Sequence, residues 1–460
     1  MIKNREIDMT NGSILNKLIK CSIPLIFINL IQTLFHATDV LMLSIIKNDS
    51  NGVAAVGETT PLINIIIGLF VGLSMGANVL VAQSKGKKDV EDTQKIIGMS
   101  MMVSVIAGFI VMLIGILCAK TLLNLMGCPV EILSSAEKYL IIYFLGMPIM
   151  LVYNFCASIM RASGDNVRPL IFLIIGGIIN IVGNYIFITV FNLTVEGVAL
   201  ASVISQLISA ILCIVVMLKT DGICKLRVSR IRFYKRKFKE LMVIGIPMGV
   251  QSVLFGLSNV FIVSSVSSFG KDAVAGYTIS QQFLSIIYTT CNAISLAVLT
   301  FVSQNYGARK IDRIKKTKRQ GLLFVAITGI KLGLIIFLLS NLLFPFVTNE
   351  EMVKKFAQTS IIYLALTYFL CGIMEVESQL TRGMGKSTTA MFISLVGNCV
   401  LRIVWLKIFP FVWWTIDMVY LSYPISWILT ILVYEITHIK LFKAEDNKEN
   451  ILEVANKTKI

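Results

Sequence analysis

Residues 23–43 read IPLIFINLIQTLFHATDVLML, an apolar run that is long enough to cross a bilayer as a single helix. Asp39 is the only acidic residue of this run, which contains no lysine or arginine. A carboxylate at membrane depth is costly to insert and is usually kept because it has a function. The run therefore predicts both a membrane-spanning helix and a candidate site within it.

The composition of the whole chain agrees with this local pattern. Of 460 residues, 56% are hydrophobic and only 15% are charged, and the mean hydropathy is +0.81. A spanning helix needs roughly 20 apolar residues, so the chain has material for about twelve spans and little for a separate soluble core. This composition excludes a disordered chain, a coiled coil, collagen and a secreted disulfide scaffold.

Apolar windows between charged or turn-rich segments define the expected spans. They must be helices, because backbone amides find no water in hydrocarbon and the alternation of barrel strands is missing. The sequence therefore predicts an all-α integral membrane protein. Its expected spans are residues 15–45, 59–83, 95–118, 135–160, 169–190 and 196–218, followed by 240–266, 275–303, 320–344, 357–381, 389–409 and 417–440.

Basic residues between these spans predict the orientation. If the N-terminus is cytoplasmic, most of the 42 Lys and Arg residues fall in cytoplasmic connections, as the positive-inside rule requires. Both termini are then cytoplasmic, and the net charge of +16 needs no nucleic-acid partner. The longest such connection, residues 219–239, is strongly basic and is expected to lie on anionic lipid headgroups. Abundant Ile, Lys and Asn suggest a bacterium of low GC content, so we expect the chain in a bacterial cytoplasmic membrane.

The two halves of the chain repeat each other. VAQSKGKKD, from Val81, aligns with VSQNYGARK, from Val302, and Pro24 aligns with Pro247. Duplication of an even number of spans predicts two lobes of the same orientation with substrate between them. Each proline allows either a hinge or a static kink. The expected division is 1–218 and 240–440 for the lobes, 219–239 for the linker and 441–460 for a cytoplasmic tail.

Two patterns suggest other functions. Residues 383–388, GMGKST, end like a phosphate-binding loop, but Leu380 occupies the position of the first glycine, so we expect no nucleotide. His36 and His438 are the only histidines, and no metal or catalytic cluster accompanies them. We therefore predict neither an enzyme nor a cofactor. His36 lies one turn before Asp39, where it either hydrogen-bonds the carboxylate or only packs.

Polar residues within the expected spans of the first half suggest a cation site. Asp39 lacks a basic neighbour, which favours either a protonated carboxyl or a bound cation. Asn180 and Asn184 lie one helical turn apart on one face, and Ser202 follows in the next span. Amide, hydroxyl and carboxylate oxygens suit a hard cation. The alternative is that the two asparagines only hold helices together.

The second half carries different intramembrane groups. Glu375 and Glu377 are two positions apart and point to different sides of their helix, and we assign Glu375 to the cavity. Gln251 adds a polar group in the seventh span. Lys331 and Arg402 are expected to have structural roles, by snorkelling or by pairing with a carboxylate.

Several short sequence segments resemble the multidrug and toxic compound extrusion (MATE) family, especially its bacterial branch. They occur in the following order along twelve spans that repeat as two halves. They are residues 23–43 quoted above, VAAVGETTPL (53–62), AQSKG (82–86), RASGDNVRP (161–169), INIVGNYIF (179–187), EGVALAS (196–202), SQNYG (303–307), MEVESQLTRGMG (374–385) and LRIVW (401–405).

The resemblance implies two six-helix lobes around a central V-shaped cavity. It also implies export of amphipathic, often cationic, organic compounds by antiport with Na⁺ or H⁺. Asp39 would be the coupling carboxylate, and a sodium ligand if Na⁺ is the ion. The resemblance places Asn180, Asn184 and Ser202 at cation-site positions, although relatives often carry a second aspartate in place of Asn184.

Further expectations follow from this resemblance. Gln251, Glu375 and His36 are assigned to the substrate cavity, and Pro24 and Pro247 to the hinges. The expected partners are small-molecule substrates and membrane lipids, and we expect a monomer. The alternative function is a flippase for a lipid-linked precursor, which would need a more basic cavity than Lys331 and Arg402 supply.

Overall fold

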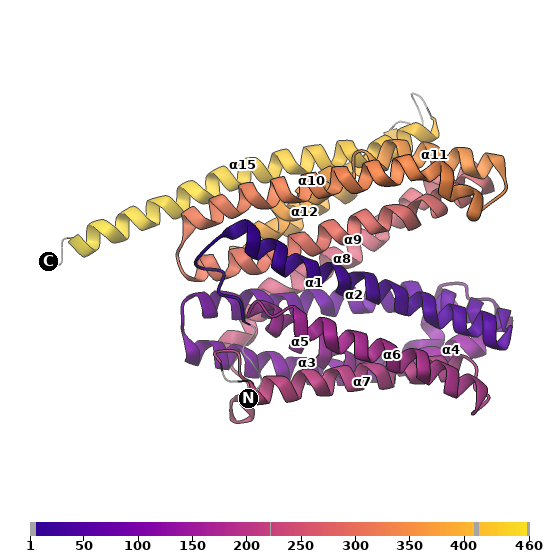
Figure 1. The fold of residues 1–460 in the computed structure, drawn as a ribbon, viewed down its shortest axis with the longest axis horizontal. Coiled ribbons are helices and arrows are strands. Elements are labelled where there is room, and N and C mark those ends of the chain that lie inside the picture. The colour runs from indigo at the N-terminus through magenta and orange to yellow at the C-terminus, as the bar shows by residue number, and fades with distance from the viewer. Residues whose placement is uncertain (1–5, 221, 409–413, 458–460) are drawn as a thin grey trace. The chain divides into compact units, whose positions relative to one another are not determined.

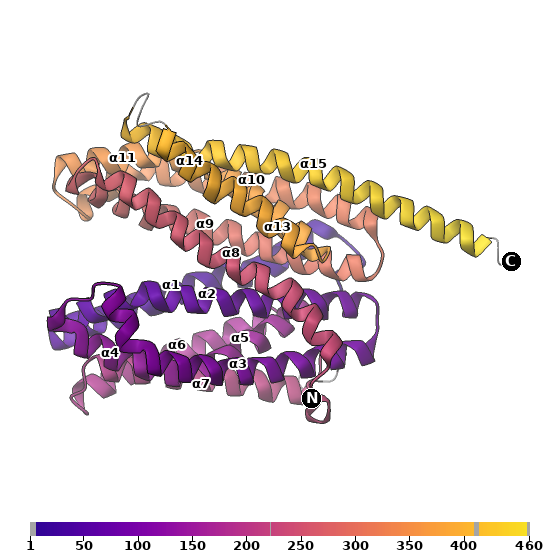
Figure 2. The same cartoon turned by 180° about the vertical axis from the view of Figure 1, so that it is seen from behind.

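The structure is a computed structural model that describes residues 6–220, 222–408 and 414–457, without the side chains of residues 36, 37, 346 and 449–457. All regular structure in these ranges is helical (Figures 1 and 2). The long helices are α1 (Ile14–Met42), α2 (Ser50–Gly86), α3 (Val90–Leu125), α4 (Val130–Leu145), α5 (Met147–Ala162), α6 (Val167–Thr189), α7 (Val195–Lys219), α8 (Lys235–Ser267), α9 (Lys271–Gly307), α10 (Ile311–Leu343), α11 (Glu351–Ala365), α12 (Tyr368–Gly383) and α15 (Ile416–Lys457).

Ten helical segments of the described chain are long and apolar enough to cross a membrane, or up to twelve if each of two bent helix pairs forms one span. The predicted class, an all-α membrane protein, is confirmed. The bent pairs are α4 with α5, at 50°, and α11 with α12, at 45°. They occupy corresponding places in the two halves, the fourth and tenth expected spans.

The bends have local causes. Pro148 follows the break at Gly146 and has no backbone N–H to continue the α4 hydrogen-bond ladder. Before α12, the Thr367 hydroxyl donates to the Tyr363 carbonyl at 2.5 Å, and such a bond to the preceding turn often bends a helix. The eleventh expected span is also irregular. It consists of α13 (Ser387–Ser394), a π-helical segment at Leu395–Val400 and α14 (Leu401–Ile408).

The chain divides into two compact units. Unit 1 comprises Met1–Asp8 and Phe27–Gly249, and unit 2 comprises Met9–Ile26 and Val250–Ile460. The boundary between the two units crosses two helices, α1 and α8. In each helix it falls just after a proline, Pro24 or Pro247. Each of these helices therefore contributes its first part to one unit and its second part to the other. Whether the prolines act as hinges stays a prediction.

Close glycine contacts join α8 to α2 within unit 1. A Cβ atom added to Gly72 would lie 2.2 Å from the backbone nitrogen of Gly249, and one added to Gly76 would lie 2.8 Å from the Cα of Gly245. Two small residues four positions apart on each helix thus let the two backbones touch, as in other membrane helix pairs. The first half of α8 is thereby fixed to α2.

The basic linker also packs on unit 1. The Gln94 amide of α3 donates to the carbonyl oxygens of Ile223 and Lys225, at 2.9 and 2.7 Å. Lys237 forms an ion pair of 2.7 Å with Asp92. Cys224 is buried by this docking, which raises the pKa of its thiol to about 12. The first part of the linker therefore packs on protein, and whether the exposed basic residues that follow lie on lipid headgroups stays a prediction.

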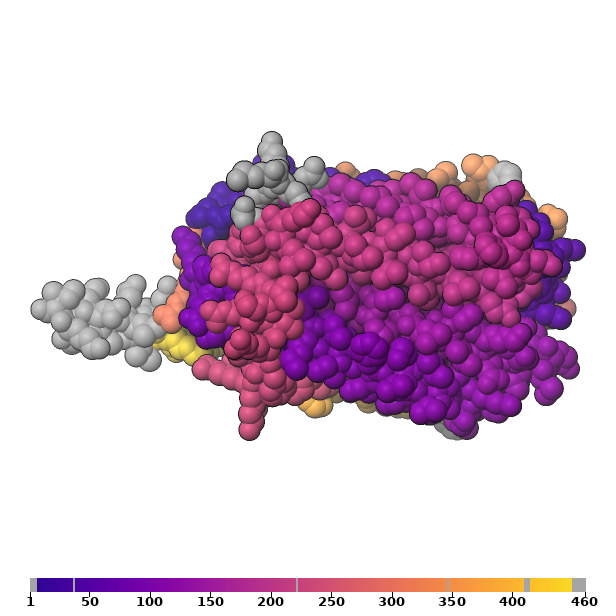
Figure 3. All heavy atoms as spheres, turned by 90° about the horizontal axis from the view of Figure 1, so that it is seen from below, coloured from indigo at the N-terminus to yellow at the C-terminus, as the bar shows by residue number. Residues whose placement is uncertain are grey.

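The outward faces of unit 1 are apolar. Phe109, Leu113 and Leu117 of α3 are half to four-fifths exposed, and α6 shows similar residues such as Ile178 and Val182. Figure 3 shows one face of the molecule, formed largely by residues of unit 1 (purple to rose). Apolar side chains on such a scale at a surface are typical of contact with lipid rather than water.

In unit 2, α9 is the central helix and packs against α10, α11 and α12, while α15 packs against α12. Residues 9–12 extend along the end of this bundle, where the Arg313 guanidinium donates to the carbonyl oxygens of Met9 and Gly12. Tyr420 and Tyr434 of α15 are fully buried.

Candidate functional site

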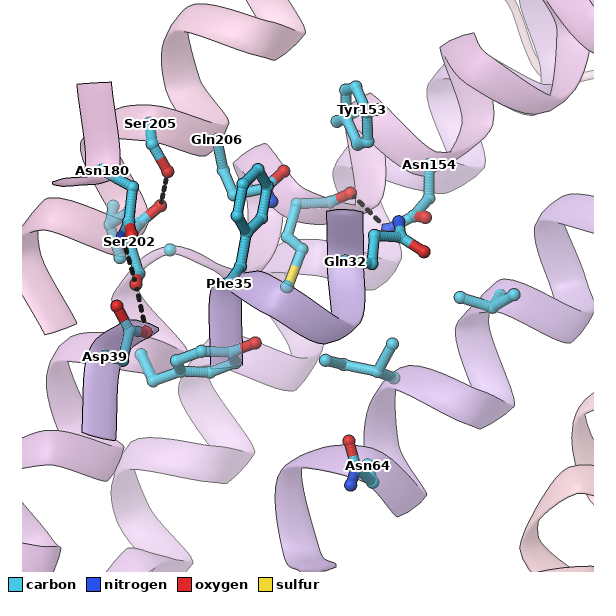
Figure 4. Close-up of a pocket in the computed structure, with 16 residues that line it drawn as sticks. Gln32, Phe35, Asp39, Asn64, Tyr153, Asn154, Asn180, Ser202, Ser205 and Gln206 are labelled. Atoms are coloured by element: carbon cyan, nitrogen blue, oxygen red, sulfur yellow. Dashed lines mark hydrogen bonds between the residues drawn. The ribbon is translucent and has the colours of Figure 1, made fainter. Parts of the chain in front are cut away.

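A cavity of about 180 Å³ lies within unit 1, and Asp39 lines it (Figure 4). Figure 4 shows Asp39, Asn180 and Ser202 together on one side, with Gln32 and Asn154 across from them. Asp39 is only 5% exposed. Other lining residues are Phe35, Asn64, Ile67, Val71, Tyr143, Gly146, Met150, Tyr153, Val203, Ser205 and Gln206.

Three side chains surround the Asp39 carboxylate. The Asn184 amide donates to Oδ1 at 2.8 Å, and the Ser202 hydroxyl donates to Oδ2 at 3.0 Å. Asn180 extends the network, because its amide donates to Ser202 Oγ at 3.0 Å and its Oδ1 accepts from Asn184 at 3.3 Å. The four residues that the sequence singled out for a cation site thus lie together, and their role there stays a prediction.

Glycines position the helix that carries both asparagines. A Cβ atom on Gly176 would lie 2.4 Å from Ser209 Oγ of α7, and one on Gly177 would lie 2.1 Å from the Phe35 ring of α1. Only glycine allows α6 to approach both neighbours this closely. As a result, the face of α6 that carries Asn180 and Asn184 lies within hydrogen-bonding distance of α1 and α7.

The described lining of the cavity is mostly apolar and neutral. No described residue that lines it is Lys or Arg. Asn184 Oδ1 is buried and has no hydrogen-bond partner among the described residues. A carboxylate beside an unsatisfied amide oxygen is the arrangement expected of a site that takes up a proton or a hard cation. The described residues contain no cluster of His, Cys, Asp and Glu that would hold a transition metal.

Unit 2 has its own, larger cavity of about 400 Å³. Glu375 lines it, is 5% exposed, and forms no hydrogen bond or ion pair with any described residue. Arg402 also lines it, but its guanidinium lies 4.2 Å from the centre of the Tyr423 ring and donates to Ser426 Oγ at 2.9 Å. The aromatic lining consists of Phe255, Tyr277, Tyr288, Tyr368, Tyr423 and Trp427.

Other predicted residues lie elsewhere. Gln251 is buried and accepts a hydrogen bond of 2.7 Å from Arg382, and it lines neither of the two cavities. The His36 side chain lies outside the described part of the structure. Lys331 is exposed. Glu377 pairs with Lys318 and with the second histidine of the chain rather than facing a cavity.

Sequence reasoning missed most of the cavity lining. Gln32, Asn64, Asn154 and Gln206 line the unit 1 cavity. Each is a polar residue within an apolar run, which is a usable signal in the sequence. The aromatic lining of unit 2 gives no such signal, because Tyr and Trp are common in membrane helices whether they face a cavity or lipid.

A duplicated bundle of membrane helices, with a carboxylate buried beside a cavity, defines the class of membrane transporters built from repeated halves. A sequence model of the MatE family matches residues 24–186 and again residues 247–406. The chain therefore belongs to the MatE (MATE) family of efflux transporters. The two matches confirm the duplication that the sequence predicts.

Relatives support this assignment. The chain is 27% identical to the probable multidrug resistance protein YoeA of Bacillus subtilis (strain 168) over 75% of its own length and 76% of the relative. It is 26% identical to the probable multidrug resistance protein YpnP of the same strain, over 86% and 88%. It is 22% identical to the multidrug export protein MepA of Staphylococcus aureus (strain MSSA476), over 81% and 82%.

Solved structures share the fold. An outward-facing multidrug resistance MATE family transporter of the MOP superfamily superposes with a TM-score of 0.89 at 19% identity, covering 97% of this chain and 100% of that one. The Vibrio cholerae MATE transporter VcmN in the bent form gives 0.87 at 20% identity, covering 94% and 98%.

Proposed function

We propose that this chain exports amphipathic, often cationic, organic compounds by antiport with Na⁺ or H⁺, and that Asp39 is the coupling site. The observation that carries the proposal is the Asp39 carboxylate itself, which lines a cavity, is only 5% exposed and accepts hydrogen bonds from Asn184 and Ser202. A charged carboxylate is costly at membrane depth, which favours uptake of a proton or a cation there.

Coupling requires that the ion bind one conformation better than the other. Asp39 and its partners come from three helices, α1, α6 and α7, so ion binding changes the forces among all three. The α1 helix also contains Pro24, which we propose as a hinge, with Pro247 as its counterpart in α8. An ion at Asp39 would thereby bias how α1 bends.

The donors around Asp39 suit either ion. For Na⁺, the candidate ligands are the Asp39 carboxylate, Ser202 Oγ and the amide oxygens of Asn180 and Asn184. For H⁺, the proton would sit on one Asp39 oxygen, with Ser202 reoriented to accept it. Asn184 Oδ1, which is buried without a partner, favours a site that gains a cation ligand.

The unit 2 cavity supports organic cations as substrates. Aromatic faces attract cations, and the Glu375 carboxylate supplies a negative charge without a hydrogen-bonded partner among the described residues. The relatives YoeA, YpnP and MepA are named for multidrug resistance or export. We propose that Glu375 contacts the substrate and that Gln251, through Arg382, positions the neighbouring helix.

We further propose that His36 contacts substrate, that the chain works as a monomer and that both termini are cytoplasmic.

The test is efflux of a fluorescent lipophilic cation from energised bacteria, with external Na⁺ and pH varied independently. We expect the parent chain to export the dye and Asp39→Asn to fail at equal membrane abundance. Glu131→Gln, which removes an exposed carboxyl of the same unit, is the matched control and should export normally. Export by Asp39→Asn would contradict the coupling role, and no export by the parent would favour a narrow-substrate exporter or a lipid flippase.

A further inference from the structure

A second buried cluster of charged groups lies in unit 2, apart from the residues that line its cavity. Its centre is Glu377 of α12, whose side chain is 0% exposed. Glu377 Oε2 lies 2.5 Å from Nδ1 of His438 on α15. The proposed transport function makes no use of this pair. A fully buried carboxylate persists only with strong partners, so the surroundings of Glu377 determine what it does.

The neighbouring charges do not balance. Lys318 of α10 lies 3.4 Å from Glu377 Oε1 and 2.7 Å from Glu435 Oε2 of α15. With His438 neutral, two carboxylates face one ammonium group and the cluster carries a net charge of −1. The other helices packed on α12 contribute no charge here, because α9 has no charged residue after Asp272 and α13 has none. Arg382 of α12 donates to the neutral Gln251 amide and keeps its charge, but it forms no ion pair with a described residue of this cluster.

Hydrogen bonding shows where one more proton would fit. Thr381 Oγ1 lies 2.8 Å from His438 Nε2, and the same hydroxyl donates to the Glu377 carbonyl oxygen at 3.0 Å. A hydroxyl has a single hydrogen, so when it is given to that carbonyl the oxygen can only accept from Nε2. On the other side of the ring, Nδ1 lies 2.5 Å from Oε2 of Glu377, an oxygen that can only accept, although neither atom has a hydrogen bond of ordinary geometry to a described residue. Two acceptors around one imidazole fit its doubly protonated form.

We propose that Glu377 and His438 form a proton-binding site in unit 2, separate from Asp39. The proton is carried on the imidazole, with Nδ1–H donating to Glu377 and Nε2–H donating to Thr381. Its uptake takes the cluster from −1 to zero. Its release is accommodated when the Thr381 hydroxyl turns to donate to Nε2. Glu435, whose side chain is 43% exposed, connects the site to solvent. Because α12 and α15 supply the two partners, the proton strengthens the contact between these helices.

The sequence makes a direct test practical, because the chain contains only two histidines. Purified full-length protein with isotope-labelled histidine would give two sets of imidazole resonances, and the His438 set is assigned by its loss in His438→Gln. We expect these resonances to titrate with pH. In Glu377→Gln, proton binding at His438 should weaken by at least about tenfold, because the adjacent negative charge is gone. In Thr381→Val it should weaken less.

Glu375→Gln is the matched control. It replaces the same residue type two positions away on the same helix, but on the side that lines the cavity. It should leave the midpoint pH of the His438 titration unchanged. A His438 resonance that does not titrate between about pH 5 and 9 would overturn the proposal. So would equal titrations in the parent and in Glu377→Gln. The measurement involves no transport, so its outcome is independent of whether Asp39 couples export.

Discussion

The two units derive from one duplicated sequence but hold different chemistry. In unit 1 the carboxylate that lines the cavity is on α1, at Asp39, and accepts hydrogen bonds from neutral donors. The corresponding position of α8 is Ile262, which is fully buried. In unit 2 the carboxylates are on α12 instead, where Glu375 corresponds to Asn154 and Glu377 to Cys156.

This difference shows that the two halves kept equivalent helix positions but carry different side chains at them. Asn154 and Glu375 each line the cavity of their own unit, so the fold presents the same position to a cavity twice. Cys156 packs against the sulfur of Met101 at 3.6 Å, whereas Glu377 binds a histidine. We therefore expect unit 1 to respond mainly to the coupling ion and unit 2 to the substrate and to a second proton.

We expect the largest effect from replacing Asp39, measured as dye transport into vesicles with an imposed ion gradient. This measurement separates the role of the ion from that of the substrate. Asp39→Asn should reduce gradient-driven transport to the level of protein-free vesicles while leaving dye binding to the purified protein intact, since binding does not need the gradient. Glu375→Gln should still respond to the gradient. Loss of dye binding in Asp39→Asn would place ion and substrate at one site and remove the distinction between the units.

The next effect concerns substrate charge. Glu375→Gln should weaken binding of a cationic dye by about tenfold, equivalent to about 1.4 kcal/mol, and should hardly change binding of a neutral analogue of similar shape. Equilibrium binding to detergent-purified protein measures both. Equal losses for the two compounds would mean that Glu375 maintains the shape of the cavity rather than recognising charge.

A smaller effect is expected when a second carboxylate is added beside the first. Asn184→Asp should lower the half-saturating concentration of the coupling cation by about fivefold, because another negative charge strengthens cation binding. If the ion is H⁺, the variant should stay active to higher pH. Initial transport rates against Na⁺ at fixed pH, and against pH without Na⁺, distinguish the two.

The control for this variant is Asn154→Asp, which adds the same charge to the same cavity on the side opposite Asp39. It should change the ion dependence much less. An equal change in both variants would attribute the effect to the overall charge of the cavity and not to the ligands around Asp39.

The last prediction concerns the packing of α2 against α8, where we expect the smallest effect on transport and measure thermal stability instead. Gly72→Ala should lower the unfolding temperature by several degrees, because its Cβ atom would overlap the α8 backbone, a change that costs about 1–3 kcal/mol. Gly57→Ala on the same helix meets nothing within 4 Å and should have no such effect. Equal thermal stabilities of the two variants would show that the close approach of α2 and α8 is not needed.

The sequence predicted the fold class and the grouping of polar side chains around Asp39 because both depend on local rules. Apolar length defines a span, and Asn180 and Asn184 share a face because a helix repeats every 3.6 residues. The pairing of Glu377 with His438 could not be predicted, since it depends on how α12 packs against α15. The same holds for Gln251, which the sequence assigned to a cavity and the structure places on Arg382.

The division of α1 and α8 between the units has a consequence for cutting the chain. A break in the linker, between η2 (Val228–Arg230) and α8, would leave the first fragment without residues 235–249 of its own unit and the second without residues 9–26 of its own. Neither fragment would contain a complete unit. We expect the two pieces to be degraded when produced alone and to accumulate only when produced together, so the gene cannot be split at its midpoint into two self-sufficient proteins.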